Sequence, residues 1–259
     1  MDDRRVGSAR SCRGVAGGGG AAYADSGNHL PRDAASVGRT AMERLRNILL
    51  PGLRLLDESG RMTGEQAGRE ALGGVESIFV VDLEMSGANA QMHEVMDVAG
   101  VRAKLEPGLP EMESWGTKVR PRHIGNAEPA ALKVIGYNPK AWREAVDLGA
   151  AMEGFTRVGA GAMITGWGIS QDIAFIVESL RRLTRPWPFA AVAFDVQPVA
   201  RAVLKSGEQV DRFNLGHVAD RLGIGRLGEH GALADAYATY DVLLKLIELI
   251  ENGSGGTGR

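Results

Sequence analysis

Five side chains in the sequence have the types and spacing that could hold divalent cations and activate water. Asp82 and Glu84 are two residues apart at the end of an apolar run, Asp172 follows a second short apolar segment, and His230 and Asp235 are five apart. Carboxylate oxygens favour Mg²⁺ or Mn²⁺, and two such ions about 4 Å apart can polarise a phosphodiester and activate water. A histidine, with an ordinary pKa near neutrality, could accept the proton of that water.

Each of these residues also has a structural explanation when it is taken alone. Asp82 and Glu84 could form a solvated strand end before a turn, and an aspartate early in a helix, such as Asp172 or Asp235, suits the helix dipole. A lone histidine such as His230 is commonly a surface or capping residue. The combination is more informative, since side chains two apart on a strand face the same way and acids beside a buried strand need a cation or hydrogen-bond partners.

The segments that must position these residues alternate between strand and helix patterns. Residues 77–85, SIFVVDLEM, form an apolar run typical of a buried strand. Residues 95–105 and 115–119 predict two further strands, which together suggest an antiparallel or mixed sheet. Shorter apolar strands are expected at residues 162–165 and 190–194.

Helical patterns surround these strands. Near the N-terminus a helix is predicted at residues 41–50 and a weaker one at 62–72, and the chain becomes helical again after Pro129. Ser170 is expected to cap a helix with an apolar stripe at Ile173, Ile176, Val177 and Leu180. The other helices are predicted at residues 141–155, 196–204, 215–222 and 232–250. Strands followed by strands alternating with helices predict an α/β domain, a mixed sheet flanked by helices.

Three parts of the chain differ in composition. Residues 1–75 form an N-terminal extension, expected to be disordered over its first 40 residues, which are rich in Gly, Ala, Ser and Arg, and then helical. A transit peptide is a weaker interpretation of those 40 residues because they contain several acids. Residues 76–251 form the predicted folded domain, and residues 252–259 a flexible tail.

Composition limits the remaining classes of protein. A net charge of −2 does not indicate nonspecific coating of long nucleic acid, and 44% hydrophobic residues suffice for a core. The single cysteine, Cys12, cannot form an internal disulfide. We expect a cytoplasmic protein with no membrane partner, because no apolar stretch of about 18 residues and no secretory signal is visible.

The order of these motifs resembles the DnaQ-like exonucleases of the DEDDh type. The acid-x-acid motif of that family matches Asp82-Leu83-Glu84, its second acid matches Asp172, and its HxAxxD motif matches His230, Ala232 and Asp235. Residues 82–87 and 169–172 are similar to oligoribonuclease, whereas residues 119–142 and 215–223 look like proofreading exonucleases. The resemblance covers most of residues 76–250 and leaves the substrate open.

The resemblance implies a ribonuclease H-like fold and a 3'-to-5' exonuclease that releases nucleoside 5'-monophosphates from single-stranded DNA or RNA. Asp82, Glu84, Asp172 and Asp235 would hold two Mg²⁺ or Mn²⁺ ions, and His230 would deprotonate the attacking water. The backbone from Met85 through Ser86 and Gly87 to Ala88 would receive the terminal nucleotide. The expected partners are 3' ends or short oligonucleotides, with a second copy of the chain or a polymerase or repair protein as the protein partner.

Several features depart from the family or receive a structural interpretation. Many relatives carry asparagine in the loop before the second acid, where this chain has Gly166-Trp167-Gly168-Ile169-Ser170. Trp167 could stack on a terminal base or pack in the core. The different-class alternative is an inactive nuclease domain that acts as a nucleic-acid-binding or scaffold protein. Residues expected to be structural are the methionines Met85, Met92 and Met96, the histidines His93, His123 and His217 as non-ligands, and Lys118, Arg120 and Arg122 on a solvated strand edge.

Overall fold

The computed structural model describes residue 43 and residues 47–49, 52–56, 59–64, 72–204, 213–225 and 231–254. Residues 43 and 47–49 are helical, in agreement with the helix predicted at residues 41–50. The predictions for residues 1–40, for residues 255–259 and for His230 lie outside the described residues.

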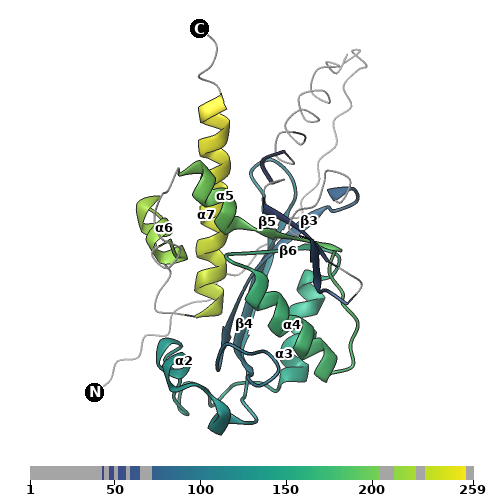
Figure 1. Ribbon diagram of the computed structural model, residues 1–259, viewed down its shortest axis with the longest axis vertical. Helices are drawn as coiled ribbons and strands as arrows, with labels where there is room; N and C mark the ends of the chain where they lie inside the picture. The colour runs from purple at the N-terminus through teal and green to yellow at the C-terminus, as the bar shows by residue number, and fades with distance from the viewer. Residues whose placement is uncertain are drawn as a thin grey trace, which may run out of the picture.

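A seven-stranded mixed sheet forms the centre of the molecule (Figure 1), with the strand order β2-β1-β7-β6-β3-β4-β5. The interior strand β3 pairs in parallel with β6 and in antiparallel with β4. β6 and β7 are also parallel, whereas β1 joins the far edge in antiparallel with β7. The strands are β1 (Leu53–Leu56), β2 (Met62–Gly64), β3 (Ser77–Met85), β4 (Val95–Lys104), β5 (Glu111–Lys118), β6 (Met163–Gly166) and β7 (Val192–Asp195).

Helices cover both faces of the sheet, which confirms the predicted ribonuclease H-like architecture (Figure 1). The long helix α7 packs with α5 and α6 on one face, and α3 and α4 pack on the other. The helices are α2 (Pro129–Val134), α3 (Leu148–Gly159), α4 (Ser170–Arg182), α5 (Val196–Val203), α6 (Leu215–Arg221) and α7 (Ala232–Ser254), with a 3₁₀ turn, η3 (Ile124–Asn126).

The alternation of side chains along β3 explains why its apolar run is so long. Ile78 and Val80 belong to the core beneath α7, whereas Phe79, Val81 and Leu83 belong to the core beneath α3 and α4. A strand with helices on both faces has no solvated side, so neither set of alternating positions can be polar until the strand ends. The first acids therefore appear where β3 leaves the two cores.

Several local predictions were wrong. Residues 62–64 are strand β2 and not the start of a helix, and β1 was not predicted. The helix expected at residues 141–155 begins only at Leu148, because the Asp147 side chain accepts a hydrogen bond from the Ala150 amide and caps it there. α7 continues through residues 252–254, which were expected to belong to the flexible tail.

Ser170 is the first residue of α4 and not its cap. The cap position is occupied by Ile169, which has no polar side chain to offer the first amides of the helix. Ile169 is fully buried and packs in the core beneath α3 and α4. Apolar packing therefore fixes the start of this helix in place of a side-chain cap.

Replacing Gly100 with alanine should destabilise the fold. Gly100 lies in β4 opposite Val81, and a Cβ atom there would lie 2.3 Å from the ring of the buried Phe79. Overpacking of this kind costs about 1–3 kcal/mol, which chemical denaturation of G100A would measure. The control is G125A, where a Cβ meets no atom within 4 Å and should change the free energy of unfolding by less than about 0.5 kcal/mol. Equal stability of the two variants would contradict this account of the packing.

Candidate metal centre

Two carboxylates extend from the end of β3 toward α7. Asp82 and Glu84 occupy the same alternating positions as Ile78 and Val80, whose side chains pack in the core beneath α7. Both acids are partly buried. The pairing of β3 with β4 continues to Met85, so the strand holds both carboxylates on one face.

The third carboxylate, Asp235, lies in the first turn of α7. Two tyrosines of α7 attach this helix to β5 and to the connection between β4 and β5. The Tyr240 hydroxyl donates to the Leu109 carbonyl at 2.6 Å, and the Tyr237 hydroxyl lies 2.8 Å from the Ser114 hydroxyl. Because α7 also packs on β3 and β4, these contacts set the position at which its first turn approaches Asp82.

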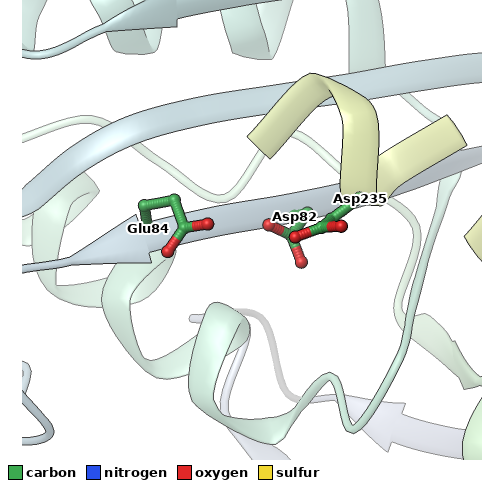
Figure 2. Close-up of side chains that lie close together, drawn as sticks. All are labelled: Asp82, Glu84 and Asp235. Atoms are coloured by element: carbon green, nitrogen blue, oxygen red, sulfur yellow. The ribbon is translucent and has the colours of Figure 1, made fainter. Parts of the chain in front are cut away.

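Asp82, Glu84 and Asp235 meet in one cluster (Figure 2). One carboxylate oxygen of each residue lies within 4.8 Å of the corresponding oxygens of the other two. Residues 151 positions apart in the chain therefore supply ligands to a single point, where three hard oxygen donors face one another.

Asp172 lies beside this cluster but outside the group of three. It is buried in the first turn of α4, and its Oδ1 atom accepts a hydrogen bond from the Leu83 amide at 3.1 Å. Leu83 separates Asp82 from Glu84, so this bond ties the start of α4 to the two acids of β3.

The loop before α4, the helix that carries Asp172, is held by Asp195, a residue that the sequence reasoning missed. Asp195 ends β7, and its Oδ1 atom accepts from the Gly168 amide and from the Gln197 amide, both at 3.0 Å. Gly168 adopts a positive φ of 64°, which favours glycine. The signal available in the sequence was an acid placed directly after the apolar residues 192–194.

Burial and mutual repulsion raise the pKa values of Asp82, Glu84 and Asp172. For Asp82 burial is the largest cause, followed by the charges of Asp172 and Glu84, and its pKa lies well above its ordinary value. Burial, with the charge of Asp235, raises the pKa of Glu84 to about 7. Burial likewise raises the pKa of Asp172 to about 7, against the opposing effect of its hydrogen bonds with backbone amides.

The sequence reasoning also missed that Asp97 and Lys118 lie next to the carboxylate cluster. Asp97 lies opposite Glu84 on β4, and its carboxylate accepts from the Lys118 ammonium at 3.0 Å. The ammonium also lies 4.1 Å from the centre of the Trp142 ring. Lys118 ends the edge strand β5, as predicted, and its partly exposed side chain is also engaged by Asp97. Its charge lowers the pKa of Glu84 but does not outweigh burial and Asp235.

The donor set fits a divalent cation. These partly buried carboxylates repel one another, and a cation shared between their oxygens would remove that repulsion. The three oxygens are of the hard type that Mg²⁺ and Mn²⁺ prefer. Asp82, Glu84 and Asp235 could hold one ion directly, with Asp172 adjacent for a second.

His230 falls outside the described residues, so its predicted role as a base stays a prediction. In the sequence it directly precedes Gly231, whose carbonyl accepts the hydrogen bond from the Asp235 amide at 3.1 Å. The predicted base is therefore separated by one residue from the helix that carries Asp235.

The predicted nucleotide-receiving residues follow Glu84 directly. Met85 is partly buried, whereas Ser86 and Gly87 are buried. Trp167 packs in the core beneath α7, and its ring stacks on that of Phe213 with the centres 5.7 Å apart, which agrees with the packing alternative. Contact of these four residues with a nucleotide stays a prediction.

Three comparisons with known proteins identify relatives. The family model RNase_T, described as exonuclease, matches residues 79–243, a span that contains all five residues predicted for catalysis. DNA polymerase III subunit epsilon of Aquifex aeolicus is 26% identical over 172 residues, which cover 66% of this chain and 81% of that protein. A Mycobacterium tuberculosis protein, whose name describes a bifunctional exonuclease/endonuclease, is 26% identical over 179 residues.

Solved structures of exonuclease I share the fold. The Escherichia coli enzyme in complex with a dT13 oligonucleotide has a TM-score of 0.60 at 20% identity, covering 70% of this chain and 42% of that chain. A zinc-bound complex of the same enzyme with single-stranded DNA has a TM-score of 0.58 at 18% identity, with the same coverage. The present chain thus spans less than half of these structures and 27% of the M. tuberculosis protein.

Within the described part of the chain, no helix combines the length and the apolar character that crossing a membrane requires.

Replacing Asp82 with asparagine should stabilise the metal-free protein by about 1–2 kcal/mol, because one of several mutually repelling carboxylates loses its charge. The raised pKa of Asp82 means that its carboxyl costs no stability below its ordinary value of about 4 and costs more as the pH rises. The gain in D82N should therefore be largest at pH 8 and vanish at low pH in denaturant titrations with EDTA.

The same variant should lose the rise in melting temperature that Mn²⁺ gives the wild type, since ion binding stabilises only a protein that retains the ligands. D220N removes an exposed aspartate of α6 and serves as the matched control. An equal Mn²⁺ response in D82N and D220N would contradict a metal centre at this cluster.

Proposed function

Because the chain belongs to the exonuclease family within the DnaQ-like superfamily, we propose that it is a metal-dependent 3'-to-5' exonuclease of single-stranded nucleic acid. The observation that carries the proposal is the convergence of Asp82, Glu84 and Asp235, with carboxylate oxygens within 4.8 Å of one another. Each acid alone has a structural explanation, but their convergence in a partly buried position does not stabilise a fold without a cation.

The proposed roles follow from position. Asp82, Glu84 and Asp235 would share one divalent ion, and Asp172 would help to hold a second beside it. When bound, Mg²⁺ or Mn²⁺ would polarise the terminal phosphodiester and favour ionisation of the attacking water. His230 would accept the proton of that water on an imidazole nitrogen. The products would be a nucleoside 5'-monophosphate and a strand one residue shorter.

Single-stranded DNA is the proposed preferred substrate. Of the two relatives named above, the one that the chain covers more fully is a DNA polymerase subunit, and exonuclease I, which shares the fold, is solved with dT13 and dA16 oligonucleotides. The same polymerase subunit supports a polymerase or repair protein as the partner. We also propose residues 76–251 as the catalytic region, to which residues 1–75 add the strands β1 and β2 of the same sheet.

Substitution of any one carboxylate should abolish most of the activity. Loss of groups that only orient metal ligands commonly costs 10- to 100-fold, so we expect D82A, E84A, D172A and D235A, as well as H230A, to lower kcat about 100-fold or more. The measurement is stepwise shortening of a 5'-labelled single strand with Mg²⁺, with Mn²⁺ and with EDTA. E144A, which removes an exposed acid far from these elements in sequence, is the control.

Two outcomes of this experiment would contradict the proposal. Activity that survives in both D82A and H230A would exclude the assigned site, and strand binding without hydrolysis by the wild type would favour an inactive nucleic-acid-binding domain. A substrate panel of dinucleotides, longer RNA and longer DNA decides the specificity. Preference for longer DNA supports the proposed substrate, whereas restriction to dinucleotides would favour an oligoribonuclease.

A further inference from the structure

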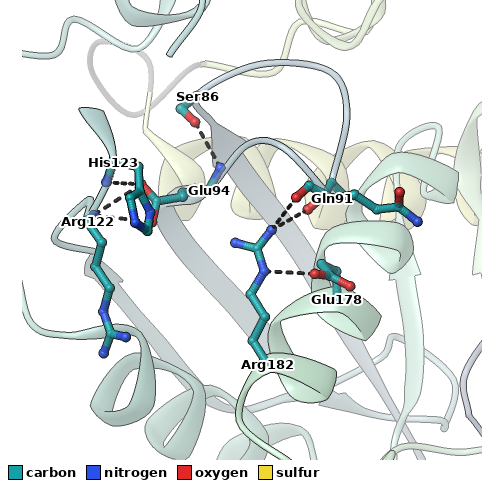
Figure 3. A network of polar contacts seen from close by, with 8 residues as sticks. Ser86, Gln91, Glu94, Arg122, His123, Glu178 and Arg182 are labelled. Carbon is teal, nitrogen blue, oxygen red and sulfur yellow. Dashed lines mark hydrogen bonds and ion pairs between the residues drawn. The ribbon is translucent and has the colours of Figure 1, made fainter. Parts of the chain in front are cut away.

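The chain that follows Glu84 is fixed by hydrogen bonds to two other segments. The Ser86 amide donates to the Glu94 carbonyl at 2.9 Å, and its hydroxyl accepts from the Glu94 amide at 2.9 Å (Figure 3). The Ser86 carbonyl accepts from the Glu128 amide at 2.7 Å. All three polar groups of this buried serine are therefore used, which leaves its backbone little freedom.

The Glu128 side chain continues this network. Its Oε1 atom accepts from the Ala88 amide at 3.3 Å and lies 3.1 Å from His93 Nε2. Glu128 occupies the cap position of α2 and is followed by Pro129, whose ring fixes the backbone at the first helical residue. One carboxylate thus joins residue 88, the start of α2 and the His93 imidazole.

His93 packs against the backbone of the same segment, residues 85–88. A Cβ atom at Gly87 would lie 2.5 Å from both Cε1 and Nε2 of the imidazole, so the glycine backbone packs directly on the ring. His93 is only 7% exposed, and its Nδ1 atom is buried without a hydrogen-bond partner among the described residues. An unsatisfied buried nitrogen costs stability, so maximal stability does not explain a histidine here.

The outer part of the loop is attached to α4. Arg182 donates to the carbonyls of Ala90 and Gln91 at 2.8 and 3.0 Å while its Nε bonds Glu178 (Figure 3). Gln171, adjacent to Asp172, donates from its side-chain amide Nε2 to the Ala88 carbonyl at 3.1 Å. Residues 85–88 are therefore connected to both β3 and α4, the elements that carry three of the four carboxylates.

We propose that His93 and Glu128 are positioning residues that hold residues 85–88 in the conformation that receives the 3'-terminal nucleotide. This inference rests on the proposed exonuclease function. Neither residue belongs to the carboxylate cluster, and they act through the backbone of Gly87 and Ala88. If this segment is no longer held in place, substrate binding must also order it, which lowers the affinity for the strand.

If Glu128 only stabilised the fold, its loss would lower the melting temperature and leave substrate affinity unchanged. The Glu128 carboxylate is 50% exposed, and ion pairs at such positions contribute little to folding. Loss of Glu128 should therefore leave the melting temperature almost unchanged, yet it removes the acceptor of the Ala88 amide and the partner of His93 Nε2. Stability and substrate affinity should separate in E128A.

Steady-state kinetics on a 5'-labelled single-stranded DNA, with Mn²⁺, test the role. H93F replaces the imidazole with a somewhat larger apolar ring and loses the Nε2 donor, and E128A loses the acceptor. We expect KM to rise about 10-fold in each, with kcat within about threefold of the wild type and an unchanged pH profile. H93Q and E128Q, which retain a donor and an acceptor at the same reach, should recover most of the affinity. E144A and H217F, at exposed positions elsewhere, are the controls.

The double variant H93F/E128A distinguishes one network from two separate effects. Residues that act together are not additive, so its KM should match that of the worse single variant. KM values within twofold of the wild type in both single variants, or no recovery in H93Q and E128Q, would overturn the positioning role alone. An inactive wild type would overturn both this role and the exonuclease function. If H93F fails to fold, the E128A and E128Q pair decides.

Discussion

Repulsion between carboxylates that converge in a partly buried position is the interaction on which the account of this molecule depends. Asp82, Glu84 and Asp235 are brought within 4.8 Å, and Asp172 lies beside them. Lys118 offsets part of this charge but is itself engaged by Asp97. Two extensive apolar cores supply the stability that tolerates such a cluster. A divalent cation would convert the repulsion into attraction.

The fold gives each carboxylate its own means of support. β3 lies in the interior of the sheet and holds Asp82 and Glu84 by pairing on both sides. The α4 start depends on buried Ile169 and on the hydrogen bonds between Asp195 and the loop before it. Tyr237 and Tyr240 attach α7 to β5 and to the connection between β4 and β5. Rigid elements with separate attachments can hold ligands against repulsion, because no single loop has to resist it.

The residues that could be predicted from sequence are those in strongly periodic or apolar segments. The β3 run and the α4 stripe predicted a buried strand and a helix of the α/β fold, and three of the four acids predicted as ligands lie in one cluster. Short elements were missed, as β2 was, because three residues carry no period. Asp195, Asp97 and the His93–Glu128 pair were not recognised, since their roles arise from contacts between residues distant in sequence.

Anomalous diffraction from crystals grown with Mn²⁺ tests the central claim most directly, because it locates the ion without reference to activity. The account predicts an anomalous peak bound by oxygens of Asp82, Glu84 and Asp235, with a second beside Asp172. At saturating Mn²⁺, a cluster without a peak, or with its carboxylates paired only to basic side chains, would contradict it.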